Sequence, residues 1–235
     1  MRQIAPTHVL GLIGGLAVGS TIHYYKALTR GLAAEGCIPR IVIAHAHVPV
    51  VFAFIRQGDY EGLAAYLHQF IVDLAAAGAT LIAVSAVTPH VCAPILSRLS
   101  PLPLIDLVEA TDNALEAHGM RTIALIGTRI AMETGLFGRL RAVALVKPSA
   151  DEVTTIHDCY IRIAAGGEDP RDIDTVRRIA RRLFAHGHAE AIVVAGTDFS
   201  PLLSDNEPEF RVLDCSRIHV EAIIRRMLGA KIAGT

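Results

Sequence analysis

Two stretches of the chain each join an apolar run to polar side chains that bind anions or transfer protons. Residues 80–90, TLIAVSAVTPH, contain Thr88, and residues 190–198, EAIVVAGTD, end in Thr197 and Asp198. Hydroxyl groups can hold a carboxylate, and a carboxylate side chain can act as a general base. The sequence therefore predicts two elbows, each a strand followed by a turn of small residues, at which chemistry could take place.

An internal repeat relates these two elbows. Gly14 and Gly127 each close a short apolar run, LGLIG and TIALIG, and they are 127 − 14 = 113 residues apart. Thr88 and Thr197, on the two elbows, are 197 − 88 = 109 residues apart. Because two strand-and-elbow pairs recur at nearly one offset, we expect a duplicated α/β unit whose elbows face each other.

Hydrophobic periodicity predicts strands and helices that alternate along the whole chain. The expected strands lie at 8–13, 39–47, 80–85, 101–107, 122–126, 142–146 and 190–195, with one more from 211; the expected helices lie at 20–33, 59–77, 89–98, 110–118, from 133, 153–165, 170–186, and up to 228. This pattern predicts an α/β fold of two pseudo-symmetric parallel-sheet domains, 1–115 plus 211–235 and 116–210, with the site in the cleft between them. In such sheets ligands bind beyond the carboxyl ends of the strands. The side chains expected at those ends are Gly14, His47, Thr88, Thr128, Thr197 and Asp214.

The composition excludes several classes of protein. Of the 235 residues 52% are apolar, which is ample for buried sheets, but every long apolar run is interrupted before membrane-spanning length. A net charge of −1 without a basic cluster argues against a nucleic-acid partner. Four widely spaced cysteines and an N-terminus without a separate signal region lead us to expect a cytoplasmic protein without disulfides.

Several groups of residues, in this order along the chain, are similar to those of one known family. They are GLIGGL at 11–16 with Ser20-Thr21 and Tyr24-Tyr25, VTPH at 87–90, Gly127-Thr128 with Met132-Glu133, Gly196-Thr197-Asp198, and Asp214 with His219. In these features the chain resembles the aspartate/glutamate racemase superfamily, in particular its cofactor-independent amino-acid racemases. The resemblance covers essentially the whole chain. It implies an isomerase that uses no pyridoxal phosphate, other cofactor or metal, binds a small amino acid or carboxylate, and forms a homodimer.

The chain departs from that family at the two positions that matter most for its chemistry. The resemblance implies two cysteines on opposite faces of the substrate α-carbon, one that removes a proton and one that supplies it. At the matching positions, just before Val87-Thr88 and Thr197-Asp198, this sequence has Ala86 and Gly196. Neither side chain can carry a proton, so the standard mechanism with two thiols cannot be transferred to this chain.

Other residues must then carry any reaction. The predicted catalytic residues are the histidines and the acid expected near the strand ends: His45, His47, His90 and Asp198. On a strand, His45 and His47 would share one face because side chains alternate. The predicted substrate-binding residues are Gly14, Gly15, Thr88, Thr128, Thr197, Asp214 and His219. We therefore expect an isomerase or lyase that acts at the α-carbon of a small amino acid or carboxylate.

Three alternatives remain open on the sequence. His45 and His47 could hold a metal together with His90, Asp214 or His219, as in a metal-dependent hydrolase or lyase. Cys92 or Cys215 could supply a thiol from another position, although a buried cysteine is most often a small core residue. The chain could also bind a small amino acid or carboxylate without catalysis. Framework roles for His90 and His219, and a capping role for Asp214, are the simpler interpretations of those side chains.

Overall fold

The computed structural model describes residues 6–141, 143–167, 169–200, 202–203 and 207–229. The chain divides into two compact units, Met1–Asp106 with His219–Thr235 and Leu107–Ile218. These limits differ by several residues from the domain limits expected near 115 and 210. The differences arise because the helix that follows residue 106 and the last strand both belong with the second sheet.

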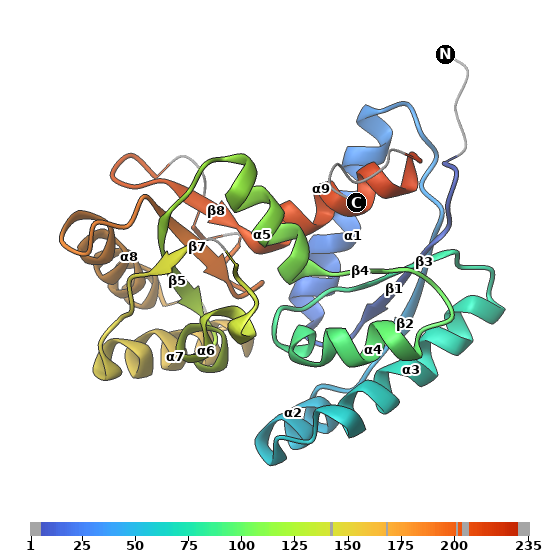
Figure 1. The fold of residues 1–235 in the computed structure, drawn as a ribbon, viewed down its shortest axis with the longest axis horizontal. Helices are drawn as coiled ribbons and strands as arrows, with labels where there is room; N and C mark the ends of the chain where they lie inside the picture. Colours follow the sequence, from blue (N-terminus) through green and yellow to red (C-terminus); the bar gives the residue numbers. More distant parts are fainter. Residues whose placement is uncertain (1–5, 142, 168, 201, 204–206, 230–235) are drawn as a thin grey trace. The chain divides into compact units, whose positions relative to one another are not determined.

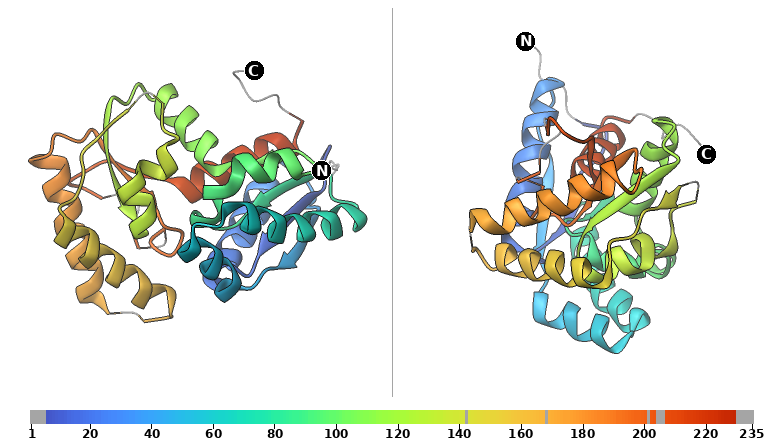
Figure 2. Two further views of the ribbon diagram at one scale, coloured as in Figure 1. Left: turned by 60° about the horizontal axis from the view of Figure 1, so that its bottom comes forward. Right: turned by 90° about the vertical axis from the view of Figure 1, so that its left-hand side faces the viewer.

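The first unit contains a four-stranded parallel sheet in the order β2-β1-β3-β4 (Figure 1). Its strands are β1 (Leu10–Gly14), β2 (Ile41–His45), β3 (Leu81–Val84) and β4 (Leu104–Ile105). Its helices are α1 (Val18–Ala34), α2 (Val48–Gln57), α3 (Tyr60–Ala76), the 3-10 helix η1 (Thr88–Cys92) and α4 (Ala93–Leu99), together with most of α9 (Cys215–Met227). Helices α1 and α9 pack on one face of the sheet and α3 packs on the other (Figures 1 and 2).

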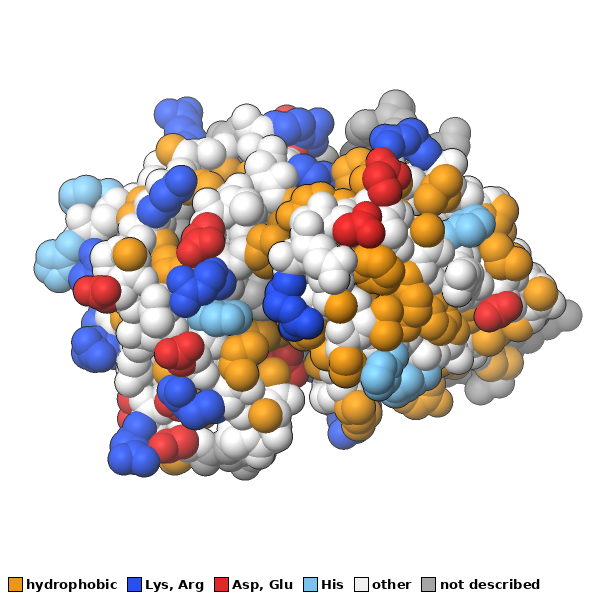
Figure 3. Space-filling view, turned by 90° about the horizontal axis from the view of Figure 1, so that it is seen from below, with side chains coloured by type: hydrophobic (Ala, Val, Ile, Leu, Met, Phe, Trp, Pro, Cys, Tyr) orange, Lys and Arg blue, Asp and Glu red, His pale blue; other side chains and the backbone are white. Residues whose placement is uncertain are grey.

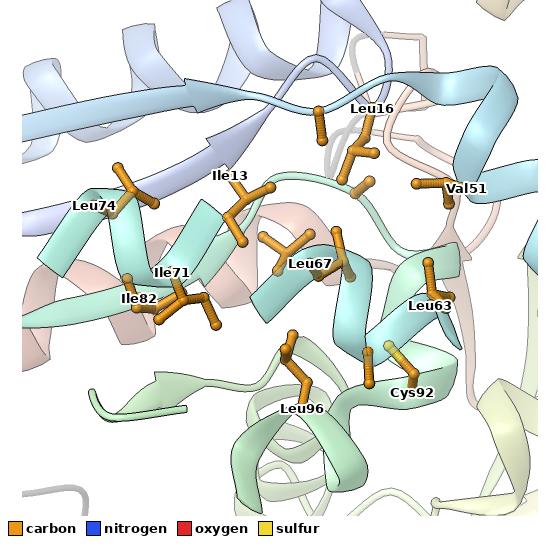
Figure 4. Packing of buried hydrophobic residues seen from close by; sticks show 14 of the residues in the cluster. Ile13, Leu16, Val51, Leu63, Leu67, Ile71, Leu74, Ile82, Cys92 and Leu96 are labelled. Carbon is orange, nitrogen blue, oxygen red and sulfur yellow. The ribbon is translucent and has the colours of Figure 1, made fainter. Parts of the chain in front are cut away.

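Strand β1 is buried along its whole length because both of its faces are covered. Leu10 and Leu12 point to the cluster formed with α1 and α9, whereas Ile13 points to the cluster formed with α3. Figure 4 shows Ile13 facing Leu67 and Ile71 of α3 in that second cluster. Continuous apolar runs are typical of parallel strands that are buried on both faces. The parallel sheet expected from this run is confirmed.

The second unit repeats this plan with a parallel sheet in the order β6-β5-β7-β8. Its strands are β5 (Thr122–Gly127), β6 (Ala144–Leu145), β7 (Ala191–Ala195) and β8 (Val212–Asp214). Its helices are α5 (Leu107–Ala117), α6 (Arg129–Gly138), α7 (Ala150–Ala164) and α8 (Pro170–Ala185). The two sheets place their first, second, third and fourth strands in the same order, so the predicted pair of pseudo-symmetric α/β sheets is confirmed.

Helix α2 is an element that the sequence analysis did not include. It follows β2 directly, has Pro49 in its first turn, and ends at Gly58, whose φ of 66° closes the helix in the left-handed region. As a consequence β2 ends at His45 rather than at His47. Asp59 then begins α3 as its N-cap, accepting a hydrogen bond from the Gly62 backbone N–H at 2.8 Å.

Helix α6 begins at Arg129, four residues before the predicted start, and its last turn is not helical. Gly135, Leu136 and Phe137 have φ values of 65°, 55° and 67°, so the chain turns in the left-handed region there. The predicted strand at 142–146 corresponds to β6, although Ala142 lies outside the described residues. Within the described part of the chain, no helix is long and apolar enough to cross a bilayer.

On the face of the second unit that Figure 3 shows (left-hand part), acidic and basic side chains are mixed rather than clustered. Helix α8 illustrates why: Arg177 pairs with Glu207, Arg181 with Glu209, and Arg182 with Glu152 at the start of α7. This helix carries four arginines at helical spacing, Arg177, Arg178, Arg181 and Arg182. Three of them, Arg177, Arg181 and Arg182, form these ion pairs.

Candidate functional site

Three loops lie at the carboxyl edge of the first sheet. Because β1 and β2 are parallel and in register, Gly14 lies beside His45. Strand β3 runs on the other side of β1, and the Ser85 N–H donates to the Ile13 carbonyl oxygen at 3.0 Å. The glycine turn after β1, the histidine that ends β2 and the elbow after β3 are therefore neighbours in the first unit.

The glycine turn is shaped by close contacts that a side chain would prevent. Gly15 has a φ of 78°, and a Cβ at this position would lie 2.7 Å from Cδ2 of the His45 ring. Its backbone N–H donates to Thr21 Oγ1 at 3.0 Å, and the Thr21 hydroxyl donates to the Ala17 carbonyl oxygen at 3.1 Å. The Gly15 N–H thus has a hydrogen-bond acceptor within the same unit, and the edge of the His45 imidazole lies against the turn.

Hydrogen bonds to buried side chains hold the first elbow in place. Ser20 donates from its hydroxyl to the Ser85 carbonyl oxygen, and Ser85 donates from its own hydroxyl to the Ile13 carbonyl oxygen at 3.2 Å. His90 Nδ1–H donates to the Ala86 carbonyl oxygen at 2.8 Å, which fixes the backbone of the elbow at Ala86. Thr88 begins η1 and keeps 8% of its surface exposed.

His90 and His219 lie inside the first unit rather than at its surface. Their rings meet edge to face with centroids 5.4 Å apart, and their exposed fractions are 1% and 0%. His219 Nε2–H donates to the Ile105 carbonyl oxygen at 2.9 Å, and its Nδ1 accepts from the Tyr24 hydroxyl at 3.0 Å. Burial and the neighbouring His90 lower the pKa of His219 to about 3. A buried, neutral imidazole with both nitrogens bonded favours the framework interpretation of His219 over substrate binding.

His45 and His47 are both exposed, but only His45 lies on a strand. His45 ends β2, whereas His47 is the N-cap of α2, and its backbone N–H donates to the Tyr66 hydroxyl at 2.9 Å. The strand expected over residues 39–47 is therefore shorter than predicted, and a shared face for the two rings stays a prediction. No group of three His, Cys, Asp or Glu side chains in the described part of the chain is arranged to hold a metal ion.

The carboxyl edge of the second sheet carries a closely packed pair of glycines. Gly127 lies beside Ala195 in the β5–β7 register, and a Cβ on Gly127 would collide with the Ala195 carbonyl group. Gly196 follows at once, and a Cβ there would lie 3.2 Å from the Gly127 Cα. Thr128 and Thr197, one residue after each glycine, are 5% and 3% exposed. Both hydroxyls therefore lie at this edge of the sheet, where they were expected.

A tyrosine that the sequence analysis did not single out completes this edge. Tyr160, on α7, donates from its hydroxyl to Asp198 Oδ2 at 2.7 Å, and its ring packs edge to face on Phe199 with centroids 5.2 Å apart. Burial raises the pKa of the half-buried Asp198 carboxyl, and the Tyr160 hydrogen bond opposes this. Burial and the nearby Asp198 carboxylate raise the pKa of the Tyr160 phenol well above its usual value. The pair is thus a protonated phenol beside a carboxylate of increased basicity.

Asp214 braces the end of the second sheet. Its Oδ1 accepts from the Ser216 backbone N–H and hydroxyl, each at 2.8 Å, and from the Ser200 hydroxyl at 3.0 Å. These bonds join the start of α9 to the loop after β7. They favour the bracing role of Asp214 over contact with a substrate.

The cysteines offer no reactive thiol within this structure. All four are buried, and Cys92 and Cys215 are 0% exposed. Burial raises the pKa of each of these two thiols to about 12, so both stay protonated at neutral pH. The alternative in which Cys92 or Cys215 supplies the missing thiol is therefore not supported.

Comparison with known proteins places this fold in a family. A family model described as Asp/Glu/hydantoin racemase matches residues 13–223. A proposed Asp/Glu racemase from Yersinia pestis is 27% identical with a TM-score of 0.84, over 94% of this chain and 100% of that chain. An aspartate racemase homologue from Pyrococcus horikoshii OT3 is 22% identical with a TM-score of 0.79, over 94% and 99% of the two chains. The aspartate racemase of Picrophilus torridus is 17% identical with a TM-score of 0.73, over 96% of each chain. The chain therefore belongs to the Asp/Glu/hydantoin racemase family.

Proposed function

We propose that this protein is an isomerase or lyase that transfers a proton at the α-carbon of a small amino acid or carboxylate without a pair of cysteines. The observation that carries the proposal is the Tyr160–Asp198 pair, which adds a proton-transfer group directly after the elbow that holds Gly196. The resemblance matches the two family cysteines to Ala86 and Gly196, so another group must take and return the proton. The proposal requires no cofactor.

Hydroxyl groups next to the two elbows are suited to binding the substrate carboxylate. Thr88 follows Ala86 in the first unit, and Thr128 and Thr197 follow the paired glycines in the second. Only a small fraction of each threonine is exposed, so water would compete little with a hydrogen bond from the hydroxyl to a carboxylate. A carboxylate held by hydroxyl donors also stabilises the negative charge that builds up when the neighbouring α-proton leaves.

Two side chains are suited to the proton transfer itself. Asp198 has a pKa raised by burial, which makes its carboxylate a stronger base than an exposed aspartate. His45 is an exposed imidazole at the end of β2, and an imidazole nitrogen can accept a proton as a general base. His47 lies two residues further on and stays a proposed contributor, whereas the bonded Nδ1 and deep burial of His90 suit it to hold the elbow.

The proposal is tested by α-proton exchange in D2O, followed by NMR, across L- and D-amino acids and small hydroxy and dicarboxylic acids. Exchange with inversion of configuration supports a two-base isomerase, and exchange on one enantiomer alone supports a one-base, lyase-like enzyme. His45→Gln then separates the bases: it should slow exchange about tenfold or more if His45 transfers a proton. Full exchange in this variant would remove His45 from the mechanism. An absence of exchange on every compound would contradict the proposed function.

A second candidate is a protein that binds a small amino acid or carboxylate without transforming it. The observation that favours it is the lack of a side chain able to carry a proton at either Ala86 or Gly196. Binding of a panel compound, seen as a raised melting temperature without α-proton exchange, would support it. The metal-dependent alternative has no comparable support, since the described residues hold no group of three suitable ligands.

The proposal also includes a homodimer as the working assembly. On α1 the side chains of Val18, Ile22 and Tyr25 are 64%, 49% and 49% exposed and follow one another at helical spacing. An apolar face of this kind is better covered than left in water. Sedimentation equilibrium measures the assembly directly, and a monomer at all concentrations would rule this part out.

A further inference from the structure

The space that a side chain at residue 196 would need is already filled. A Cβ on Gly196 would lie 2.6 Å from Cε2 and 3.1 Å from Cδ2 of the Tyr160 ring. The first of these contacts is shorter than real Cβ atoms make, so either the ring or the elbow would have to move. The ring cannot move cheaply, because it is 8% exposed and packs edge to face on Phe199. The present position of the Tyr160 ring therefore requires glycine at residue 196.

Helix α7 brings this ring to the elbow and is itself firmly anchored. It begins with a capping box, in which the Glu152 N–H donates to Ser149 Oγ at 3.3 Å and the Ser149 N–H donates to Glu152 Oε2 at 2.8 Å. Two residues after Tyr160, Arg162 pairs with Asp172 at the start of α8 at 2.6 Å. A helix fixed at both ends holds the Tyr160 hydroxyl at a defined point beside the elbow.

We propose that Tyr160 takes over the side-chain space of residue 196 and serves as the positioning residue for Asp198, which becomes the acid–base group of the second elbow. The ring excludes a cysteine side chain at Gly196, and the hydroxyl orients and stabilises the Asp198 carboxylate through the 2.7 Å hydrogen bond. The chemical role of Asp198 rests on the proposed function. The positioning role of Tyr160 can be tested without any turnover.

The proton transfer that this pair supports is balanced by simple steps. The Asp198 carboxylate takes the α-proton and becomes a carboxylic acid, while the electron pair of the C–H bond moves into the substrate carboxylate as an enolate. The same proton, or a deuteron exchanged from solvent, then returns from Asp198 to the α-carbon. Tyr160 keeps its own proton throughout, because its phenol pKa is raised well above the usual value. It therefore acts on the reaction only through Asp198.

Removing the hydroxyl should make the Asp198 carboxyl a weaker acid. A hydrogen bond from Tyr160 stabilises the charged form and lowers the pKa, so Tyr160→Phe should raise the pKa of Asp198 by roughly one pH unit. The pKa can be followed by ¹³C NMR on protein labelled at aspartate carboxyl carbons, with the signal assigned by its loss in Asp198→Asn. The matched control is Tyr60→Phe in the first unit, which deletes a phenol elsewhere and should leave the Asp198 signal unchanged.

An unchanged Asp198 titration in Tyr160→Phe would overturn the positioning role. If α-proton exchange is present, the acid limb of its pH profile should move upward with the carboxyl pKa. A shifted carboxyl signal in a protein without exchange would refute the proposed function and leave the positioning role standing. The two failures can therefore be told apart.

A second pair of variants tests the shared space independently of titration. Gly196→Ala should lower the melting temperature in the natural background, because its Cβ meets the Tyr160 ring. In a Tyr160→Ala background the same change should cost much less, because the space is then empty. Equal losses in the two backgrounds would show that the two positions do not compete, and would overturn the steric part of the proposal.

Discussion

At the scale of single residues, the histidine pair beneath the first elbow shows how burial decides what an imidazole can do. His219 receives a hydrogen bond from Tyr24 on one ring nitrogen and donates one to Ile105 from the other. This pattern needs the neutral ring, since a charged imidazole has no acceptor nitrogen. Together with full burial, it converts a potential base into a link between α1, which carries Tyr24, and β4, which carries Ile105.

The neutral state of His219 predicts an acid-sensitive stability. Its pKa is near 6.5 when unfolded and about 3 when folded, so the unfolded chain takes up the proton first. The contribution to stability is complete above pH 6.5 and is lost as the pH falls from there toward 3. Between pH 7 and pH 5 the loss amounts to about 2 kcal/mol. Urea unfolding at pH 7 and at pH 5 gives the loss of unfolding free energy between the two pH values. This loss should be smaller by about 2 kcal/mol in His219→Gln than in wild type. An identical pH dependence in both proteins would contradict this account.

At the scale of secondary structure elements, glycines let β5 and β7 end close together. A side chain on Gly127 would collide with the backbone carbonyl group of Ala195 on the neighbouring strand, and backbone cannot turn aside as a flexible side chain can. The close approach of β5 and β7, which places Thr128 and Thr197 at the same edge of the sheet, therefore requires glycine at residue 127.

This contact predicts an unequal cost for two similar substitutions. Gly127→Ala should destabilise the fold by about 3 kcal/mol or more, because the β5–β7 pairing must open locally. Gly119→Ala is the matched control: its φ is 64° with open space around it, so only left-handed strain of about 1 kcal/mol is expected. Chemical unfolding of the two variants measures both costs. Equal losses would mean that the contact with Ala195 is not the limiting one.

Sequence periodicity was sufficient for the buried central strands and insufficient at their ends. Strands β1, β3, β5 and β7 are short apolar runs closed by small residues, and their predicted limits lie within two residues of the observed ones. Helix α2 could not be recognised because its residues, VPVVFAFIRQ, are apolar on nearly all sides and carry no clear helical period. Strand β8 has only three residues, and which sheet it joins is decided by tertiary pairing.

The candidate site divides in the same way. Thr128, Thr197 and Asp198 were expected at strand ends, and they lie there because they directly follow β5 and β7. Tyr160 gave no local signal, since a tyrosine on an amphipathic helix usually marks core packing. The one hint in the sequence was Gly196, whose missing side chain leaves space that some other residue has to fill.

At the scale of the whole molecule, two sheets with the same strand order carry two elbows that differ in chemistry. The first elbow has Ala86 with a buried histidine bonded to its carbonyl group, and the second has Gly196 with the Tyr160–Asp198 pair. The two units thus have the same strand order but carry different polar groups at their elbows. We therefore expect proton transfer that depends on a carboxylate and not on a thiol.

That claim is tested most directly by comparing α-proton exchange in D2O for three proteins: wild type, Asp198→Asn, and a double variant with Cys92→Ala and Cys215→Ala. Both cysteines are buried with raised pKa values, so wild type and the double variant should exchange the α-proton at similar rates per folded molecule. Asp198→Asn should reduce exchange about 100-fold or more while its melting temperature is maintained, because it removes a buried base whose charged form burial disfavours. Exchange that persists in Asp198→Asn, or that disappears with the cysteines, would contradict the account.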